Sequence, residues 1–237
     1  MGTAINISDV TRSFGLRKAL DRLSFSLPQG AFLSVFGHNG AGKSTLLRIL
    51  TTLDHPSSGA VEILGLNARK DADKIRERIG YISHNPMLYG DMTAEENLLF
   101  FARLYGVNNP QLRVRDLLDD VELAHRRLDT VRTFSRGMTQ RLAIARALLH
   151  DPELVFLDEP YAGLDPHAVE ILDGLLASIR SRRTFVMVSH NLSSGYAHAS
   201  HVLLLSHGRA VCFESTQDLA LESLTDLYRR DVSEGVF

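Results

Sequence analysis

Short apolar runs separated by polar turns dominate the first third of the chain. Runs around Ile5, Phe25, Val35 and Val61 predict strands. The tripeptide at 28–30, Pro-Gln-Gly, predicts a tight turn between two of them. The N-terminal third is therefore expected to be rich in strands.

A helical period replaces this pattern in the middle of the chain. Residues 94–104 follow Thr93, a typical N-cap, and Glu96 three residues later completes a capping box. A second periodic segment, 111–121, follows a proline. We interpret residues 86–148 as a helical insert.

Strand and helix patterns alternate again after about residue 149. Apolar runs near Leu154, Val186, Leu204 and Val211 predict strands, and residues 215–230 predict an amphipathic C-terminal helical region. The chain is therefore expected to form one α/β domain. Its predicted parts are a split core at 1–85 and 149–214, the helical subdomain at 86–148, and a C-terminal helical tail at 215–237.

Composition narrows the class of protein. The net charge of −2 argues against a nucleic-acid partner, and the one cysteine, Cys212, permits no intrachain disulfide. No segment approaches the roughly 20 apolar residues of a spanning helix, and the N-terminus lacks a secretory pattern. Composition fits a soluble subunit, and the single cysteine is compatible with a reducing cytosol.

The stretch at 37–45 fits the phosphate-loop pattern Gly-x4-Gly-Lys-Ser/Thr and follows an apolar run. Glycines allow backbone N–H groups to surround phosphates, Lys43 would reach the β- and γ-phosphates, and Ser44 would hold Mg²⁺. The alternative is a glycine-rich turn before an ordinary helix. The predicted phosphate loop consists of Gly37, His38, Asn39, Gly40, Ala41, Gly42, Lys43, Ser44 and Thr45.

Two carboxylates follow the apolar run 154–157, which is typical of a strand buried on both faces. Successive strand residues point to opposite faces, so Asp158 and Glu159 are expected to do different work. We assign Asp158 to the metal and Glu159 to the attacking water. An acidic, solvated strand end is the alternative.

A third motif, Phe-Ser-Arg-Gly-Met-Thr-Gln-Arg at 134–141, precedes a helical pattern with Ser135 as N-cap. Here the chain resembles the ATP-binding cassette (ABC) family, whose signature Leu-Ser-Gly-Gly-Gln occupies this place. The corresponding positions here are Ser135, Arg136, Gly137 and Met138. Arg136 replaces the first glycine of the signature, and Met138 replaces its glutamine.

Smaller landmarks follow the same family order. Phe14 occupies the position of an aromatic that stacks on adenine, Asp165 ends a D-loop, and His190 matches the switch histidine. His84 stands where the family usually has the Q-loop glutamine, and we assign it a hinge and nucleotide-sensing role. Taken singly, these residues also suit packing, helix capping or a solvated loop.

The resemblance implies a P-loop NTPase core of ABC type, with an N-terminal antiparallel β subdomain and an inserted α-helical subdomain. It also implies Mg²⁺-dependent ATP hydrolysis with Glu159, His190 and Lys43 as catalytic residues. Two subunits of the family meet head to tail, so the signature of one closes on ATP held by the other. The implied partners are a second copy and a membrane-spanning transporter subunit, at the cytoplasmic face of the membrane.

Within that family, residues 81–106, 135–138 and 158–165 resemble the ATPase subunit of cytochrome c maturation haem exporters. This narrower resemblance implies haem-handling membrane partners. The alternatives are a generic or multidrug efflux ATPase, a soluble cassette ATPase of DNA repair or translation, and a nucleotide-gated interaction module.

Overall fold

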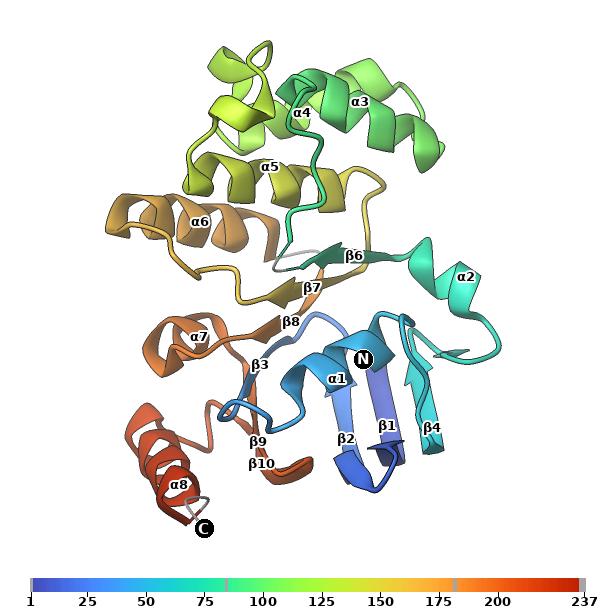
Figure 1. Ribbon diagram of the computed structural model, residues 1–237, viewed down its shortest axis with the longest axis vertical. Helices are drawn as coiled ribbons and strands as arrows, with labels where there is room; N and C mark the ends of the chain where they lie inside the picture. Colours follow the sequence, from blue (N-terminus) through green and yellow to red (C-terminus); the bar gives the residue numbers. More distant parts are fainter. Residues whose placement is uncertain (1, 84, 181–182, 235–237) are drawn as a thin grey trace.

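The computed structural model describes residues 2–83, 85–180 and 183–234. Two sheets form its framework (Figure 1). An antiparallel sheet of four strands has the order β2-β1-β4-β5, and a sheet of six strands has the order β10-β9-β3-β8-β7-β6. The first sheet contains β1 (Thr3–Phe14), β2 (Arg17–Pro28), β4 (Ser58–Ile63) and β5 (Leu66–Asn67).

The six-stranded sheet is parallel apart from its edge strand β10, which pairs antiparallel with β9. Its carboxyl edge is therefore the place where a ligand site is expected in an α/β protein. Its strands are β3 (Phe32–Phe36), β6 (Ile79–Ile82), β7 (Leu154–Asp158), β8 (Thr184–Val188), β9 (His201–Ser206) and β10 (Arg209–Ser215).

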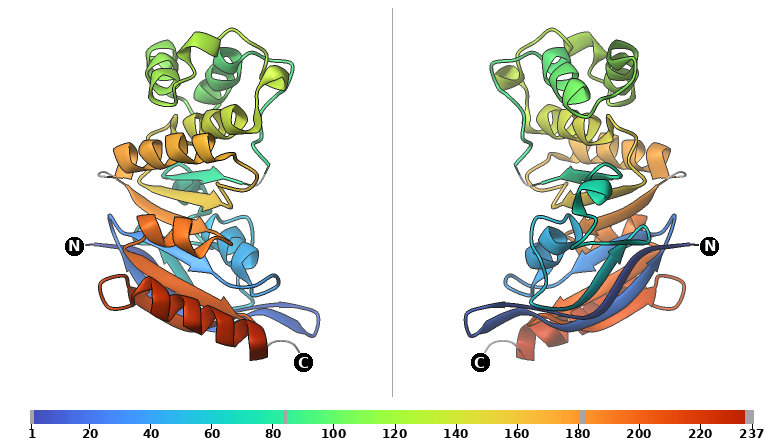
Figure 2. Two further views of the ribbon diagram at one scale, coloured as in Figure 1. Left: turned by 90° about the vertical axis from the view of Figure 1, so that its left-hand side faces the viewer. Right: turned by 90° about the vertical axis from the view of Figure 1, so that its right-hand side faces the viewer.

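Helices cover both faces of the six-stranded sheet, and the helical insert lies at one end of the molecule, as the side views show (Figure 2). The helical insert at that end contains α3, α4, α5 and two 3-10 helices, η1 (Ala124–Arg126) and η2 (Val131–Thr133). The α-helices are α1 (Lys43–Leu50), α2 (Ala72–Arg76), α3 (Ala94–Leu104), α4 (Pro110–Asp120), α5 (Arg136–Leu148), α6 (Pro166–Ile179), α7 (Leu192–His198) and α8 (Leu221–Glu234).

The central strands are buried on both faces, as their apolar runs predict. In β7, Leu154 and Phe156 belong to the core that joins α1 with both sheets, whereas Val155 and Leu157 belong to the core under the helical insert. This alternation is the period of two that a strand imposes. One continuous apolar run therefore supplies two cores.

The caps predicted for two helices are confirmed. The Glu96 N–H donates a hydrogen bond to the Thr93 hydroxyl oxygen, and the Thr93 N–H donates one to Glu96 Oε2, which makes the full capping box of α3. Ser135 caps α5 by accepting from the Met138 N–H at 3.2 Å.

The C-terminal helix begins later than the sequence pattern predicts. Strand β10 continues through Ser215, which pairs with His201 of β9. The Ser215 carbonyl then accepts from the N–H groups of Asp218 and Leu219, forming a turn, and α8 begins at Leu221. The strand pairing and this turn take up the first residues of the predicted helical segment.

Candidate nucleotide site

The phosphate loop runs from the end of β3 to the start of α1, and its backbone is in close contact with its neighbours. A Cβ atom built on Gly37 would lie 2.3 Å from the Leu205 carbonyl oxygen, and one on Gly42 would lie 2.5 Å from that of Ala19. Both glycines also have positive φ, 149° and 110°. Glycine is required at both positions because other residues would clash and be strained.

Lys43 begins α1, and its ammonium group is held by the loop itself. Its Nζ donates to the carbonyl oxygens of Gly37 at 2.6 Å and His38 at 3.0 Å. Burial lowers the pKa of Lys43, while the negative charges of Glu159 and Asp158 raise it. The arrangement places a buried cation beside the loop N–H groups, as binding of a phosphate requires.

A cavity of about 490 Å³ opens over this loop. Its walls come from the β1–β2 hairpin, the phosphate loop with the start of α1, and the carboxyl ends of β7 and β8 with the residues after them, which are far apart in the sequence. The lining residues are Phe14, Arg17, Ala19, Asn39, Gly40, Gly42, Lys43, Ser44, Thr45, Asp158, Glu159, Val188 and His190.

Three predicted loop residues lie outside that lining. Ala41 is buried in the core, and Gly37 packs against β9. The His38 Nδ1 lies 2.8 Å from the Asn39 carbonyl oxygen, and its ring meets the ring of His207 at 5.1 Å between centroids. These three residues face away from the cavity and pack the phosphate loop against the rest of the domain.

Glu159 differs from the alternation that the sequence pattern predicts. Strand β7 ends at Asp158, and Glu159 takes the left-handed conformation with φ 53° while its N–H donates to the Val188 carbonyl at 3.0 Å. The rule that neighbours point to opposite faces holds only inside a strand. Both carboxylates therefore reach the same cavity.

Glu159 is paired with the predicted switch histidine. The His190 Nε2 lies 3.0 Å from Glu159 Oε1, and the His190 N–H donates to Oε2 at 3.1 Å. Burial raises the pKa of Glu159, and the contacts with His190 counteract this rise. A carboxylate of raised pKa, oriented by a histidine, suits a general base.

Ser44 and Asp158, which both carry side-chain oxygen atoms, line the cavity. Burial raises the pKa of Tyr81 to about 12, and the Asp158 charge and a hydrogen bond to Asp158 contribute. No cluster of three or more His, Cys, Asp or Glu side chains able to hold a metal occurs in the described ranges. Hard oxygen donors in small number fit Mg²⁺, which uses one or two protein ligands and substrate phosphates.

The signature residues lie away from the nucleotide cavity of their own chain. A Cβ on Gly137 would lie 2.8 Å from the Ala168 Cβ, so the start of α5 packs on α6. Arg136 lies over the D-loop, because a Cβ on Gly163 would lie 2.5 Å from its guanidinium. Asp165 caps α6 by accepting from the Ala168 N–H at 2.9 Å.

A second cavity, of about 290 Å³, lies between the signature helix and the carboxylates. Arg136, Thr139 and Gln140 of α5 line it together with Asp158 and Glu159. His84, the predicted sensing residue, lies outside the described residues, while Pro86 nearby lines this cavity.

Sequence patterns missed Arg17, Ala19 and Val188, which line the nucleotide cavity. Arg17 approaches the phosphate loop closely, since its Nη2 would lie 3.3 Å from a Cβ on Gly40. Its only sequence signal is its place three residues after Phe14 on the opposite strand of a hairpin. Contacts of this kind depend on how the two sheets face each other, which no local pattern encodes.

Apolar side chains are exposed beside the helical insert. Met87 and Tyr89 are 49% and 51% exposed, and Phe100 of α3 is 41% exposed. Tyr89 and Phe100 contact edge to face, with ring centroids 5.3 Å apart. Leu88, between the first two, instead packs against the core.

The model of the ABC transporter family matches residues 20–162. The bacitracin transport ATP-binding protein BcrA of Bacillus licheniformis is 40% identical over 211 residues, which cover 88% of this chain and 69% of that protein. The daunorubicin resistance ATP-binding protein DrrA3 of Streptomyces coeruleorubidus is 33% identical over 93% of this chain and 71% of its own length.

Solved structures share the fold. The ATP-binding subunit of an ABC transporter superposes with a TM-score of 0.86 at 28% identity, covering 97% of this chain and all of that chain. The ATP-binding cassette MJ0796, as a dimer in a post-hydrolysis state with ADP and Pi, gives a TM-score of 0.80 at 27% identity, with 89% and 98% covered. Across the described part of this chain, no helix is long and apolar enough to cross a membrane.

Proposed function

This chain belongs to the ABC transporter family, and on that basis we propose that it is the ATPase subunit that drives a separate membrane-spanning subunit. The observation that carries the proposal is the single cavity that joins the phosphate loop, both carboxylates and His190. We further propose that the subunit works as a homodimer at the cytoplasmic face of the membrane.

The cavity residues divide the work of ATP hydrolysis. The loop N–H groups, the N-terminus of α1 and Lys43 would bind the β- and γ-phosphates. Ser44 and Asp158 would hold Mg²⁺, which when bound supplies positive charge to the phosphates. Glu159 would accept a proton from the attacking water, and His190 would hold the Glu159 carboxylate toward it. Phe14, 53% exposed at the cavity rim, would stack on the adenine.

The exposed apolar surface formed by Met87, Tyr89 and Phe100 supports a membrane partner. In the ABC family, the groove beside the Q-loop receives a coupling helix of the membrane subunit. Clustered exposed aromatic side chains are typical of binding surfaces. We propose that this surface receives that helix.

We propose efflux as the transport task. The similar proteins are named for bacitracin transport and daunorubicin resistance, and a third, at 33% identity over 92% of this chain, for Nod factor export in Rhizobium etli. These names favour the efflux hypothesis over the haem-export hypothesis, which rests only on the resemblance of residues 81–106, 135–138 and 158–165. Haem-handling partners remain the specific expectation of that second hypothesis.

Purification of the tagged chain from detergent-solubilised cells tests the proposal, with partners identified by mass spectrometry. We expect a multi-span subunit to be retained and ATPase activity to accompany it. A drug-efflux permease as the partner supports efflux, whereas haem-handling proteins support the haem-export hypothesis. Recovery of an active ATPase with no membrane partner contradicts the transport role.

A pH profile tests the proposed pairing of Glu159 with His190. His190 lowers the pKa of Glu159, so His190→Gln should raise that pKa further. The base acts when ionised, so the acid limb of kcat/KM should move to higher pH in the variant, in addition to the lower rate. The exposed His55 provides the control His55→Gln, which should leave the profile in place. An unmoved limb in His190→Gln argues that another group controls it.

A further inference from the structure

The turn between β9 and β10 lies directly behind the phosphate loop. Gly208, in this turn, donates its N–H to the Ala41 carbonyl oxygen at 2.9 Å. The neighbouring His207 meets the ring of His38 edge to face. The turn thus contacts the loop at two of the residues that do not line the nucleotide cavity.

Strand β2 holds the same turn from its other side. The Asp21 N–H donates to the Gly208 carbonyl at 2.9 Å, and a Cβ on Gly208 would lie 2.7 Å from the Ala19 carbonyl oxygen. Gly42 of the phosphate loop approaches both, because its Cβ would lie 2.5 Å from the Ala19 oxygen and 3.5 Å from the Gly208 Cα. Three backbones therefore meet with no room for a side chain between them.

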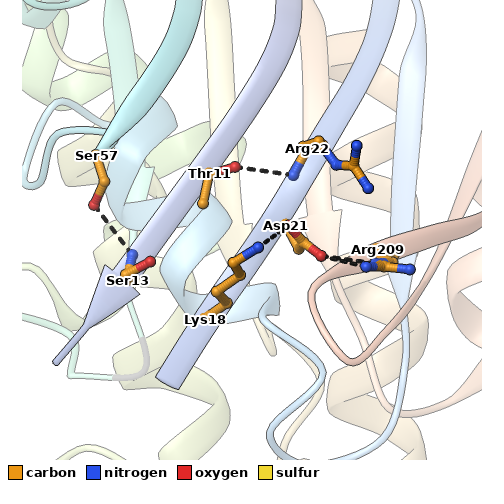
Figure 3. A network of polar contacts seen from close by, with 7 residues as sticks. All are labelled: Thr11, Ser13, Lys18, Asp21, Arg22, Ser57 and Arg209. Carbon is orange, nitrogen blue, oxygen red and sulfur yellow. Dashed lines mark hydrogen bonds and ion pairs between the residues drawn. The ribbon is translucent and has the colours of Figure 1, made fainter. Parts of the chain in front are cut away.

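A charged network fastens this arrangement (Figure 3). Arg209, which begins β10, donates from Nε at 2.9 Å and from Nη2 at 2.5 Å to Asp21 Oδ2, and Lys18 Nζ donates to Oδ1 at 2.8 Å. The Asp21 side chain is only 8% exposed. The hydrogen bonds from Lys18 and Arg209 lower the pKa of Asp21 to about 2, so the carboxylate is ionised at neutral pH.

We propose that Asp21 and Arg209 are positioning residues that set the phosphate loop for nucleotide binding through the turn at 207–208. Neither side chain lines the nucleotide cavity. Their ion pair joins β2 to the residue after Gly208 and so restrains the turn in its contact with Ala41. An anion site made of backbone N–H groups depends on the direction in which these groups point. A displaced loop therefore binds the nucleotide more weakly, although all of its binding groups are still present.

The inference rests on the proposed function, and variants of the ion pair test it in the full chain. Arg209→Met and Asp21→Asn remove the pair, and the combined variant tests whether both act through one interaction. Arg209→Lys keeps the charge. Glu153→Gln is the matched control, because Arg78 contacts Glu153 through Nε at 2.7 Å and Nη2 at 2.9 Å at the opposite end of the parallel strands.

The measurements are the Kd of a fluorescent N-methylanthraniloyl derivative of ATP with Mg²⁺, kcat and KM for ATP, and unfolding by urea. We expect Arg209→Met and Asp21→Asn to raise the Kd about 3- to 10-fold, as the loss of a charge-assisted contact allows. The double variant should raise the Kd no more than the larger single change. Arg209→Lys should recover most of the affinity, and kcat at saturating ATP should change less than about twofold.

Wild-type affinity in Arg209→Met, or an equal loss in Glu153→Gln, overturns the inference. The inference is also overturned if the loss of nucleotide affinity among the variants follows only their loss of unfolding free energy, with Arg209→Lys binding no better than Arg209→Met. Failure of the wild-type chain to bind the nucleotide is a different result, because it overturns the proposed function itself.

Discussion

Glu159→Gln should lower ATP turnover by roughly 10²- to 10⁴-fold, the contribution of a positioned general base, while nucleotide binding is retained. Glutamine preserves the size of the side chain and its hydrogen-bonding oxygen but accepts no proton. Glu159 lies in the cavity beside His190 and close enough to Lys43 for its charge to raise the lysine pKa. The other carboxylate among the described lining residues is Asp158, to which we assign the Mg²⁺ ion instead.

Single-turnover hydrolysis and nucleotide affinity should be measured together in this variant. Glu153→Gln, a half-exposed carboxylate at the opposite end of β7, should behave like the wild type. The folded state should tolerate Glu159→Gln, because burial raises the pKa of Glu159 above its ordinary value and so disfavours the ionised form. Near-normal hydrolysis would falsify the assignment of Glu159 as base.

Local rules explain why several elements could be predicted from the sequence. The capping box of α3 involves only Thr93 and Glu96, and the N-cap of α5 only Ser135 and Met138. The apolar run of β7 needs both faces covered wherever it lies in the fold. Such features depend on neighbours within a few residues, or on burial alone.

Other parts of the site depend on contacts between distant segments. Glu159 leaves the strand alternation because its N–H bonds to Val188 of the neighbouring strand. Arg17 reaches the cavity because the β1–β2 hairpin packs against the phosphate loop. The residues behind that loop, Gly208 and Asp21, belong to no recognised motif. A motif identifies the chemistry of this site, whereas the packing of two sheets decides which side chains complete it.

Arg136 illustrates how structure resolves an ambiguous substitution. From sequence alone, the arginine either adds charge near the phosphates or points to solvent. The residue is exposed, and its guanidinium lies over Gly163, whose φ of 69° and lack of Cβ leave the required space. The departure from the family signature is thus accommodated inside the same chain, by the D-loop glycine.

The arrangement of the signature leads to the second large effect. Ser135 and Gly137 do not line the cavity that holds Lys43 in the same chain. If a second copy supplies them, the effect of a phosphate-loop defect together with a signature defect depends on whether the two changes are on the same chain or on different chains. Ser135→Asp is the suitable signature defect, because aspartate is a good N-cap and keeps α5 intact while its charge opposes the γ-phosphate. Ser135→Asn keeps the cap without that charge and serves as the control.

Dimers with differently tagged chains separate the two arrangements. When Lys43→Ala is on one chain and Ser135→Asp on the other, both defects fall on one composite site and the second site is intact. When one chain carries both changes and its partner none, each composite site carries one defect. We therefore expect measurable ATPase activity in the first dimer and a loss of about 10²-fold or more in the second, because Lys43→Ala removes a positive charge from the phosphates and Ser135→Asp adds an opposing negative one. If each chain builds its own site, the result is reversed, because only the second dimer then contains an undamaged chain.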